Sequence, residues 1–390
     1  MKNFKRCRTK FGMTMRGMTR MFATLALGAA LAMGFASCET ETDDPTYYTV
    51  TFDSDGGSDV ASQIVESGKT ASKPAAPIKT GYAFNGWYNG DTAFDFATTI
   101  TADITLKAKW LEGFVKVNGG TVTGDSKYAS SDDDYIFIEG RTVTIGDLYV
   151  CDHEVTQKEY ETYCKYSSYS PSETYGVGDN YPAYYVSWYD AIVYCNLRSI
   201  DEGLTPVYII GDETSPSKWT EIVSEATDGG TRYCAPSSEN NTWDAITSNE
   251  NANGYRLPTE EEWEYIARGG NRGLPESQTT YSGSDTIDDV AWYEKNSAGD
   301  CHEVKGKQPN SLGIYDMSGN IIEWVDNLYK EFTESAKADT NGAYNTCHTA
   351  RGGSFANSSI SCTVAMRYLG HTNPYVGIAA IGFRVVRNAE

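Results

Sequence analysis

The stretch Tyr255-Arg256-Leu257-Pro258-Thr259-Glu260-Glu261-Glu262-Trp263-Glu264-Tyr265 decides how most of the chain is interpreted. Thr259 followed three residues later by Glu262 is a capping box, which predicts a helix beginning after Thr259. Trp263 and Ile266 then fall on the face of that helix that points to a core. The glutamates of this stretch occupy the first turns, where the helix dipole stabilises negative charge. We therefore interpret them as structural residues and not as a catalytic cluster.

Two further helix starts precede this one. Thr156-Gln157-Lys158-Glu159 is a second capping box, and Ser187-Trp188-Tyr189-Asp190 opens another helix whose buried side includes Ile192 and Cys195. Residues 199–253 are rich in Gly, Ser, Thr and Asn, and we interpret them as an insertion with short strands, for example over 206–210. Short apolar runs broken by Gly and Asn then predict a loop-rich α+β domain over residues 113–390.

Seven blocks of this region, in order, resemble the formylglycine-generating-enzyme family, also called sulfatase-modifying factors. The blocks are Glu154-Val155-Thr156-Gln157, 181–191, 255–265, 310–320, Glu323-Trp324, Arg351-Gly352-Gly353-Ser354 and Ile381-Gly382-Phe383-Arg384. The resemblance implies a fold related to C-type lectins. The family includes oxidases, iron sulfoxide synthases and noncatalytic ligand-binding proteins, so membership alone does not fix the function.

A separate pattern covers residues 47–110. An alternating run from Tyr47 predicts a strand, Asp55-Gly56-Gly57 predicts a turn, and 104–110 predicts a closing strand. With its aromatic motifs the segment resembles one Listeria–Bacteroides repeat, a small β-grasp-like module, and we expect a spacer without chemistry of its own. Trp87 and Trp110 could stack on a ligand, but in so small a unit we interpret them as core residues.

The N-terminus has the pattern of an export signal. Residues 1–37 carry seven Lys and Arg, and the apolar run 21–35 is too short to span a bilayer. Phe35-Ala36-Ser37-Cys38 resembles a bacterial lipobox, which implies lipidation of Cys38; an ordinary signal with an incidental cysteine is the alternative. The acidic residues within 38–46 predict a solvated tether. The resemblance to Bacteroidetes-type lipoproteins implies an outer-membrane lipoprotein exposed on the cell surface.

Composition narrows the class of partner. The chain has 390 residues, a net charge of −21 and 28 tyrosines, so it can bury real cores but is too acidic for a nucleic-acid binder. We expect an unknown protein or glycan ligand at the cell surface, and a membrane contact only through the lipid anchor.

The metal-dependent activities of the family can be tested on single residues. In the oxidases, two cysteines shortly after the Gly-Gly-Ser block bind copper, because thiolates are the soft ligands that Cu(I) selects. Here Asn357 occupies the first position, and Cys362 matches either the second position or a different, structural cysteine of the family. The histidines that an iron site needs are scattered, at His153, His302, His348 and His371. We therefore expect neither copper nor catalysis.

A structural calcium ion is the cofactor that we expect. The family's site uses an acid or amide side chain, two backbone carbonyls and a glutamate, and the matching residues here are Asp316, Gly319, Ile321 and Glu323. Such hard oxygen ligands suit calcium. In the alternative interpretation, Asp316 caps a turn and Glu323 is a surface acid.

The C-terminal block has an unusual composition. Residues 352–383 contain no Lys, Glu, Gln, Asp or Trp, and apart from Met366 the residues between the scaffold positions are reachable from an Asn codon by changing its adenines. This resembles the variable region of diversity-generating-retroelement proteins, which display altered side chains for binding, much as antibody paratopes do. An ordinary degenerate loop is the alternative. The candidate ligand-binding residues are Phe355, Ala356, Asn357, Ser359, Ser361, Thr363, Tyr368, His371 and Tyr375.

These observations are compatible with three alternative functions. A surface-anchored lipoprotein with a noncatalytic ligand-binding domain is the first. An active oxidase that acts on sulfatase cysteines is the second, and an envelope structural or accessory protein is the third.

Overall fold

The computed structural model describes residues 44–128, 136–167, 169–270, 278–328, 348–368 and 373–389. The predicted signal peptide, the lipidation site Cys38, most of the acidic tether and the candidate ligand contact His371 lie outside these residues. Residues from Thr46 onward form one unit. Among the described residues, no helix has both the length and the apolar character needed to cross a membrane.

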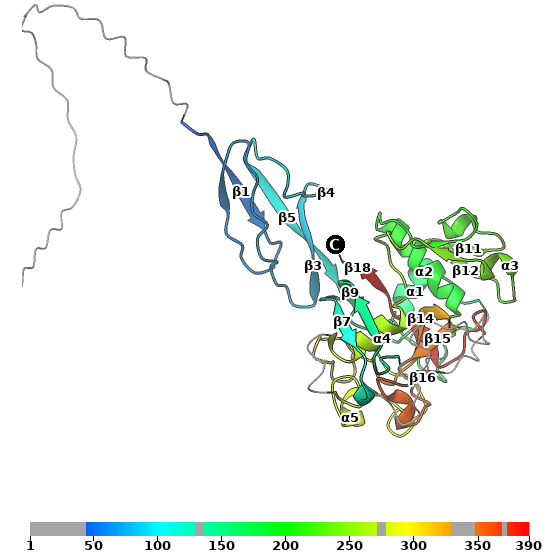
Figure 1. The fold of residues 1–390 in the computed structure, drawn as a ribbon. Helices are drawn as coiled ribbons and strands as arrows, with labels where there is room; N and C mark the ends of the chain where they lie inside the picture. The colour runs from blue at the N-terminus through cyan, green and yellow to red at the C-terminus, as the bar shows by residue number, and fades with distance from the viewer. Residues whose placement is uncertain are drawn as a thin grey trace, which may run out of the picture. The chain divides into compact units, whose positions relative to one another are not determined.

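The first part of this unit is a five-stranded sheet with the order β2-β1-β5-β3-β4 (Figure 1). Its strands are β1 (Tyr47–Asp53), β2 (Gln63–Glu66), β3 (Tyr82–Asn89), β4 (Thr92–Ala93) and β5 (Ile104–Glu112). β1 runs parallel to β5, and the other pairs are antiparallel. Trp87 lies in the core of this sheet, and Trp110 packs partly buried beside it while its Nε1 donates to the Ser54 carbonyl at 3.0 Å. Both tryptophans are therefore packing residues.

The larger domain, residues 113–390, is the one we call the head. Its first strands form a sheet with the strand at its C-terminal end. β6 (Phe114–Val117), β9 (Leu148–Cys151) and β18 (Val386–Asn388) form an antiparallel sheet in the order β18-β9-β6. β7 (Gly120–Thr123) and β8 (Thr142–Ile145) form a separate hairpin. The last strand of the chain thus pairs with a strand near the start of the head.

The three predicted helix starts are confirmed. α1 (Gln157–Tyr163), α2 (Trp188–Asp201) and α4 (Glu260–Ala267) each begin with a complete capping box, at Thr156, Ser187 and Thr259 respectively. The residues expected to face the core are buried: Ile192 and Cys195 on α2, and Trp263 and Ile266 on α4. Two single-turn helices, α3 (Asn241–Asp244) and α5 (Ile287–Val290), complete the set that the described residues contain.

The region 199–253 forms two small antiparallel pairs. β10 (Tyr208–Ile209) pairs with β13 (Thr247–Ser248), and β11 (Val223–Thr227) pairs with β12 (Gly230–Cys234). Trp219 and Trp243 from this region pack in the same hydrophobic core as α2.

A four-stranded sheet in the order β16-β15-β14-β17 crosses the middle of the head. Its strands are β14 (Ile322–Leu328), β15 (His348–Arg351), β16 (Arg367–Tyr368) and β17 (Ile381–Phe383). β14 pairs antiparallel with β15 and parallel with β17. Because β15, β16 and β17 frame residues 352–380, the ends of the predicted binding segment are fixed in the core. The predicted loop-rich α+β class is confirmed.

Candidate ligand-binding segment

Three buried arginines mark the boundaries of the segment between β15 and β17. Arg351 closes β15, Arg367 opens β16 and Arg384 follows β17, and each is at most 1% exposed. A buried guanidinium needs a partner, because an unpaired charge in the interior is costly. Glutamates from α4 and β14 supply these partners.

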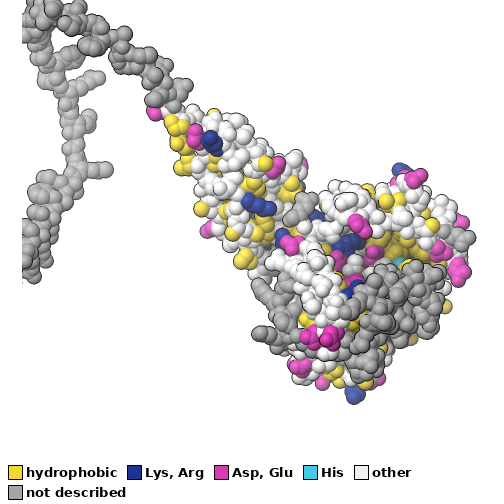
Figure 2. Space-filling view, viewed as in Figure 1, with side chains coloured by type: hydrophobic (Ala, Val, Ile, Leu, Met, Phe, Trp, Pro, Cys, Tyr) yellow, Lys and Arg dark blue, Asp and Glu magenta, His cyan; other side chains and the backbone are white. Residues whose placement is uncertain are grey.

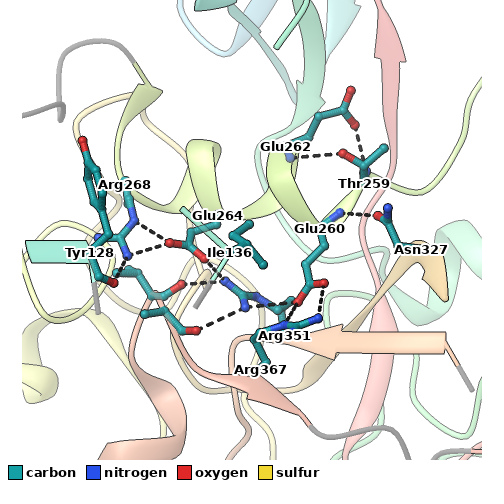
Figure 3. A network of polar contacts seen from close by, with 12 residues as sticks. Tyr128, Ile136, Thr259, Glu260, Glu262, Glu264, Arg268, Asn327, Arg351 and Arg367 are labelled. Carbon is teal, nitrogen blue, oxygen red and sulfur yellow. Dashed lines mark hydrogen bonds and ion pairs between the residues drawn. The ribbon is translucent and has the colours of Figure 1, made fainter. Parts of the chain in front are cut away.

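Helix α4 holds the first two arginines, as Figure 3 shows. Arg367 donates to both carboxylate oxygens of Glu260, with Nε to Oε1 at 2.7 Å and Nη2 to Oε2 at 2.9 Å. Arg351 lies between two glutamates, with Nη1 3.3 Å from Glu260 Oε1 and Nη2 in contact with Glu264 Oε2. Burial alone would raise the pKa of Glu260, but Arg367 and Arg351 hold it below the usual value. Glu260 is therefore ionised in the fold.

The third arginine pins the far end of the segment to β14. Arg384 Nε donates to Glu323 Oε2 at 2.7 Å, and its Nη2 contacts Glu323 Oε1. Trp263 Nε1 donates to the same Glu323 Oε2 at 2.6 Å, so helix α4 also reaches this pair. Glu323 is fully buried, which contradicts the alternative in which it is a surface acid.

Sequence reasoning identified these glutamates as structural but missed their partners. Glu260 and Glu264 are four residues apart, so they share one face of α4, and that face points to the core. The spacing was a usable signal, because two acids on a buried helix face require buried cations.

Two candidate ligand-binding residues lie in the interior, and this corrects their assignment. Phe355 is 3% exposed, with its ring centroid 6.0 Å from that of Tyr175, and Tyr375 is 2% exposed against Tyr189. Large aromatic side chains gain more from burial than from display, so they anchor the segment.

The rest of the segment is more accessible. Ala356 is exposed, and the candidates that are half-buried are Asn357, Ser359, Ser361, Thr363 and Tyr368. Two apolar side chains outside the list of candidate contacts are also exposed: Ile360, 56% exposed on the short 3₁₀ helix Ser359–Cys362, and Val376, 42% exposed.

The backbone of the segment is held independently of these side chains. Phe355 N–H donates to the Asn320 carbonyl at 2.8 Å, and Glu294 N–H donates to the Asn357 carbonyl at 3.0 Å. Because main-chain bonds do not depend on residue type, side chains between the anchors can change while the loop keeps its path.

The thiol of Cys362 does not fit a two-thiolate copper site. Cys362 is fully buried, burial raises the pKa of its thiol to about 12, and it is the only thiol at the two matching positions, where the copper site needs two. At the first copper position, the Asn357 amide oxygen accepts a hydrogen bond from Ser354 Oγ at 2.7 Å. The six cysteines among the described residues are all buried and unpaired. No copper-dependent step can be derived from these residues.

Three of the predicted calcium ligands, Asp316, Gly319 and Ile321, lie in the turn before β14, and Glu323 lies in β14 itself. Asp316 and Gly319 have positive φ angles of 58° and 77°, and the side chains of Asp316 and Glu323 are buried. Burial raises the pKa of Asp316 to about 6 and raises the pKa of nearby Glu154, and the carboxylate of Glu323 adds to both shifts while Arg384 opposes them. Both oxygens of Glu323 already accept hydrogen bonds from Arg384 or Trp263, so a cation at this turn would have to share that carboxylate. Within the described part of the chain, no group of three or more His, Cys, Asp or Glu side chains could hold a metal. Backbone carbonyls would have to complete the shell.

Comparison with known proteins places this geometry in a family. A family model described as the sulfatase-modifying factor enzyme 1-like domain matches residues 102–389, and the Listeria–Bacteroides repeat domain matches residues 48–109. The head is thus an α+β domain of the formylglycine-generating-enzyme and C-type-lectin-like class. The chain belongs to the sulfatase-modifying factor enzyme 1-like family, and both resemblances seen in the sequence are confirmed.

Individual relatives differ in what their names describe. "Chaperone protein LppX" of Paenibacillus barcinonensis is 37% identical over 248 residues, covering 55% of this chain and 80% of that protein. "Formylglycine-generating enzyme" of Streptomyces coelicolor is 30% identical over 169 residues, covering 38% of this chain and about half, 52%, of the enzyme. The structure of "Treponema denticola variable protein 1" superposes with a TM-score of 0.54 at 28% identity, covering 70% of this chain and 94% of that one.

Proposed function

We propose that this protein is a noncatalytic ligand-binding protein whose contact surface is the segment 352–383. The observation that carries the proposal is a difference in burial between two sets of residues within that segment. Buried arginines and aromatic residues fix its path, while small polar side chains such as Ser358 and Ser359 reach the surface. The likeness to the Treponema variable protein supports this assignment and supports diversification of the segment.

The experiment compares the wild-type protein with a variant in which Ala356, Asn357, Ser358, Ile360 and Ser361 are replaced together by other small or aromatic residues. Both are applied to a glycan array and to a panel of bacterial surface proteins. We expect the pattern of bound ligands to change while the melting temperature stays within a few degrees. A matched set of five exposed replacements in the repeat module is the control. Identical binding patterns, or collapse of the fold, would contradict the proposal.

A second candidate is the oxidase, the activity for which the Streptomyces relative is named. Incubation with Cu(I) and a sulfatase-derived cysteine peptide tests it. We expect no turnover, because the only thiol at the matching positions is Cys362, which is buried and protonated. Turnover that disappears in Cys362→Ser would restore the oxidase. An envelope structural or accessory role is the remaining alternative. Binding to the array that depends on the segment would support ligand binding over this role.

We place the protein in the bacterial cell envelope, anchored to the outer membrane through Cys38 and facing outward. The support is the charged and apolar order of residues 1–37 and the lipobox-like Phe35-Ala36-Ser37-Cys38. Metabolic labelling with a palmitate analogue tests this. Label should enter the wild type and not Cys38→Ala.

A structural calcium ion completes the proposal, held by the Asp316 carboxylate, the carbonyls of Gly319 and Ile321, and the Glu323 carboxylate, which it would share with Arg384 and Trp263. The ion would supply positive charge to a buried turn rather than chemistry.

A further inference from the structure

A cavity of about 250 Å³ opens beside the N-terminal end of α2, apart from the segment's exposed side chains. Its lining comes from three places in the chain: the start of α2, the end of α3 together with β10 and β13 of the insertion, and the hairpin β14–β15. The residues used below are Trp188, Tyr189, Tyr208, Asp244, Asp326 and His348. Figure 2 shows hydrophobic side chains gathered on the head, with a histidine among them and acidic side chains nearby.

Aromatic rings form the floor of this cavity. Trp188 and His348 stack with centroids 3.6 Å apart and planes at 17°, and Tyr208 meets Trp188 edge to face at 6.0 Å. Burial lowers the pKa of His348 to about 3, so the imidazole is neutral at physiological pH. The floor is therefore aromatic and carries no positive charge, with its rings packed mainly against one another.

The hydrogen-bond donors of these rings are already used. Tyr208 O–H donates to Asp326 Oδ1 at 2.8 Å, and Tyr189 O–H donates to Asp244 Oδ1 at 3.0 Å. Trp188 Nε1–H donates to the Val325 carbonyl at 2.9 Å. Within the described residues, Oδ2 of Asp244 and Oδ2 of Asp326 accept no hydrogen bond. The cavity consequently presents acceptors, and a ligand has to bring the donors.

The charges that line the cavity also favour a ligand that brings hydrogen-bond donors. Two carboxylates line it, and none of its described lining residues is Lys or Arg. Burial raises the pKa of Asp326, and Arg256, whose guanidinium is engaged by both oxygens of Glu262, offsets this only in part. Asp244 is exposed at the rim and Asp326 is half-buried, so one carboxylate meets the ligand first and the other lies deeper.

We propose that this cavity binds an ammonium or guanidinium group, the end of a lysine or arginine side chain of a partner protein. Such groups carry only donors and pair with carboxylates, and their flat or aliphatic parts pack well beside aromatic rings. A neutral sugar would leave the exposed carboxylate of Asp244 without a charge partner. The inference goes beyond the proposed function, since it concerns a different set of residues.

Tyr375 connects the two surfaces. Its hydroxyl lies 2.7 Å from Asp244 Oδ1, and it accepts a hydrogen bond from Asn240 N–H at 2.9 Å. A partner bound to the segment could thus place a cationic side chain in the cavity.

The first test needs only the wild-type protein. Nα-acetyl-arginine amide and Nα-acetyl-lysine amide are titrated by calorimetry and by tryptophan fluorescence, beside the neutral isostere Nα-acetyl-citrulline amide and beside glucose. We expect saturable binding of one or both cations, at least about tenfold tighter than citrulline, weakening as salt is raised. Binding of glucose or citrulline as tight as that of the cations, or no binding of either cation at millimolar concentration, would overturn the proposal.

Variants then place the binding in the cavity. Asp244→Asn and Asp326→Asn should each weaken the tighter cation at least about tenfold. Asp212→Asn, the same change at an exposed turn of the insertion, should leave affinity within about twofold. If Asp326→Asn does not fold, the test rests on Asp244→Asn, because Asp244 is exposed. Unchanged affinity in Asp244→Asn refutes the site. The segment variant described under the proposed function keeps the cavity, so loss of array binding and loss of arginine binding are distinguishable failures.

Discussion

Glu260 at the start of α4 and Arg367 at the start of β16 are 107 residues apart in sequence and share two hydrogen bonds in a site that excludes water. Arg351 joins the same carboxylate from the other end of the segment. One glutamate thus closes the loop 352–366 at its base. The geometry of a variable surface is set by residues that the ligand never touches.

Replacement of that glutamate should destabilise the whole head. Glu260→Gln leaves two buried guanidinium groups short of a charge partner, and breaking a buried pair in this way costs about 3–5 kcal/mol. Urea unfolding at pH 7 measures the loss. Glu239→Gln, an exposed residue of the insertion, is the matched control and should change stability by no more than about 0.5 kcal/mol. Equal midpoints for the two variants would show that the Glu260 pair contributes nothing.

The same pair predicts an acid-dependent term in stability. Arg367 and Arg351 hold the pKa of Glu260 below its usual 4.5, so its contribution is complete above pH 4.5 and is lost as the pH falls through the lower, folded-state pKa. The stability difference between the wild type and Glu260→Gln should therefore be constant from pH 7 to 5 and shrink toward pH 3. Unfolding curves of both proteins across this range test it, because other carboxylates cancel in the difference. A difference that grows on acidification would reverse the sign and refute the assignment.

Local patterns predicted much of this fold. The caps at Thr156, Ser187 and Thr259 depend on residues three positions away, so they can be read from a short window. The ordered family blocks likewise fixed the class of the head. The burial of Phe355 and Tyr375 could not be predicted in this way, because composition does not distinguish one residue of a run from another.

Contacts between residues far apart in the sequence explain why the helix caps were predictable and the burial of these two aromatic residues was not. Phe355 packs against Tyr175, and Tyr375 against Tyr189, each nearly two hundred residues away, and no local period records such contacts. The cavity beside α2 escaped sequence analysis for the same reason, since Asp244 and Asp326 come from different elements. Sites built from one contiguous motif are predictable, whereas sites built by topology are not.

Within the segment, burial separates anchors from displayed positions. Phe355→Ala removes a buried ring and should cost about 3–5 kcal/mol, whereas Ile360→Ser, at a side chain that is 56% exposed, should change stability by about 0.5 kcal/mol or less. Thermal and urea unfolding of the two variants provide the comparison. The reverse order would mean that Ile360 is the anchor and would remove the physical basis for a variable surface here.

Calcium should stabilise the fold through the turn before β14. An ion that binds only the folded state adds about 2.7 kcal/mol at a free concentration one hundred times its dissociation constant, which corresponds to a rise in melting temperature of roughly 5 °C or more. Thermal unfolding in calcium and in EDTA measures this for the wild type. Asp316→Ala removes one of the two ligating carboxylates, so its melting temperature should respond much less, and magnesium should have a smaller effect on the wild type because it prefers a rigid octahedral shell. If calcium and EDTA give the same wild-type curve, the buried acids near Asp316 are balanced by Arg384 and protonation alone, and the turn holds no ion.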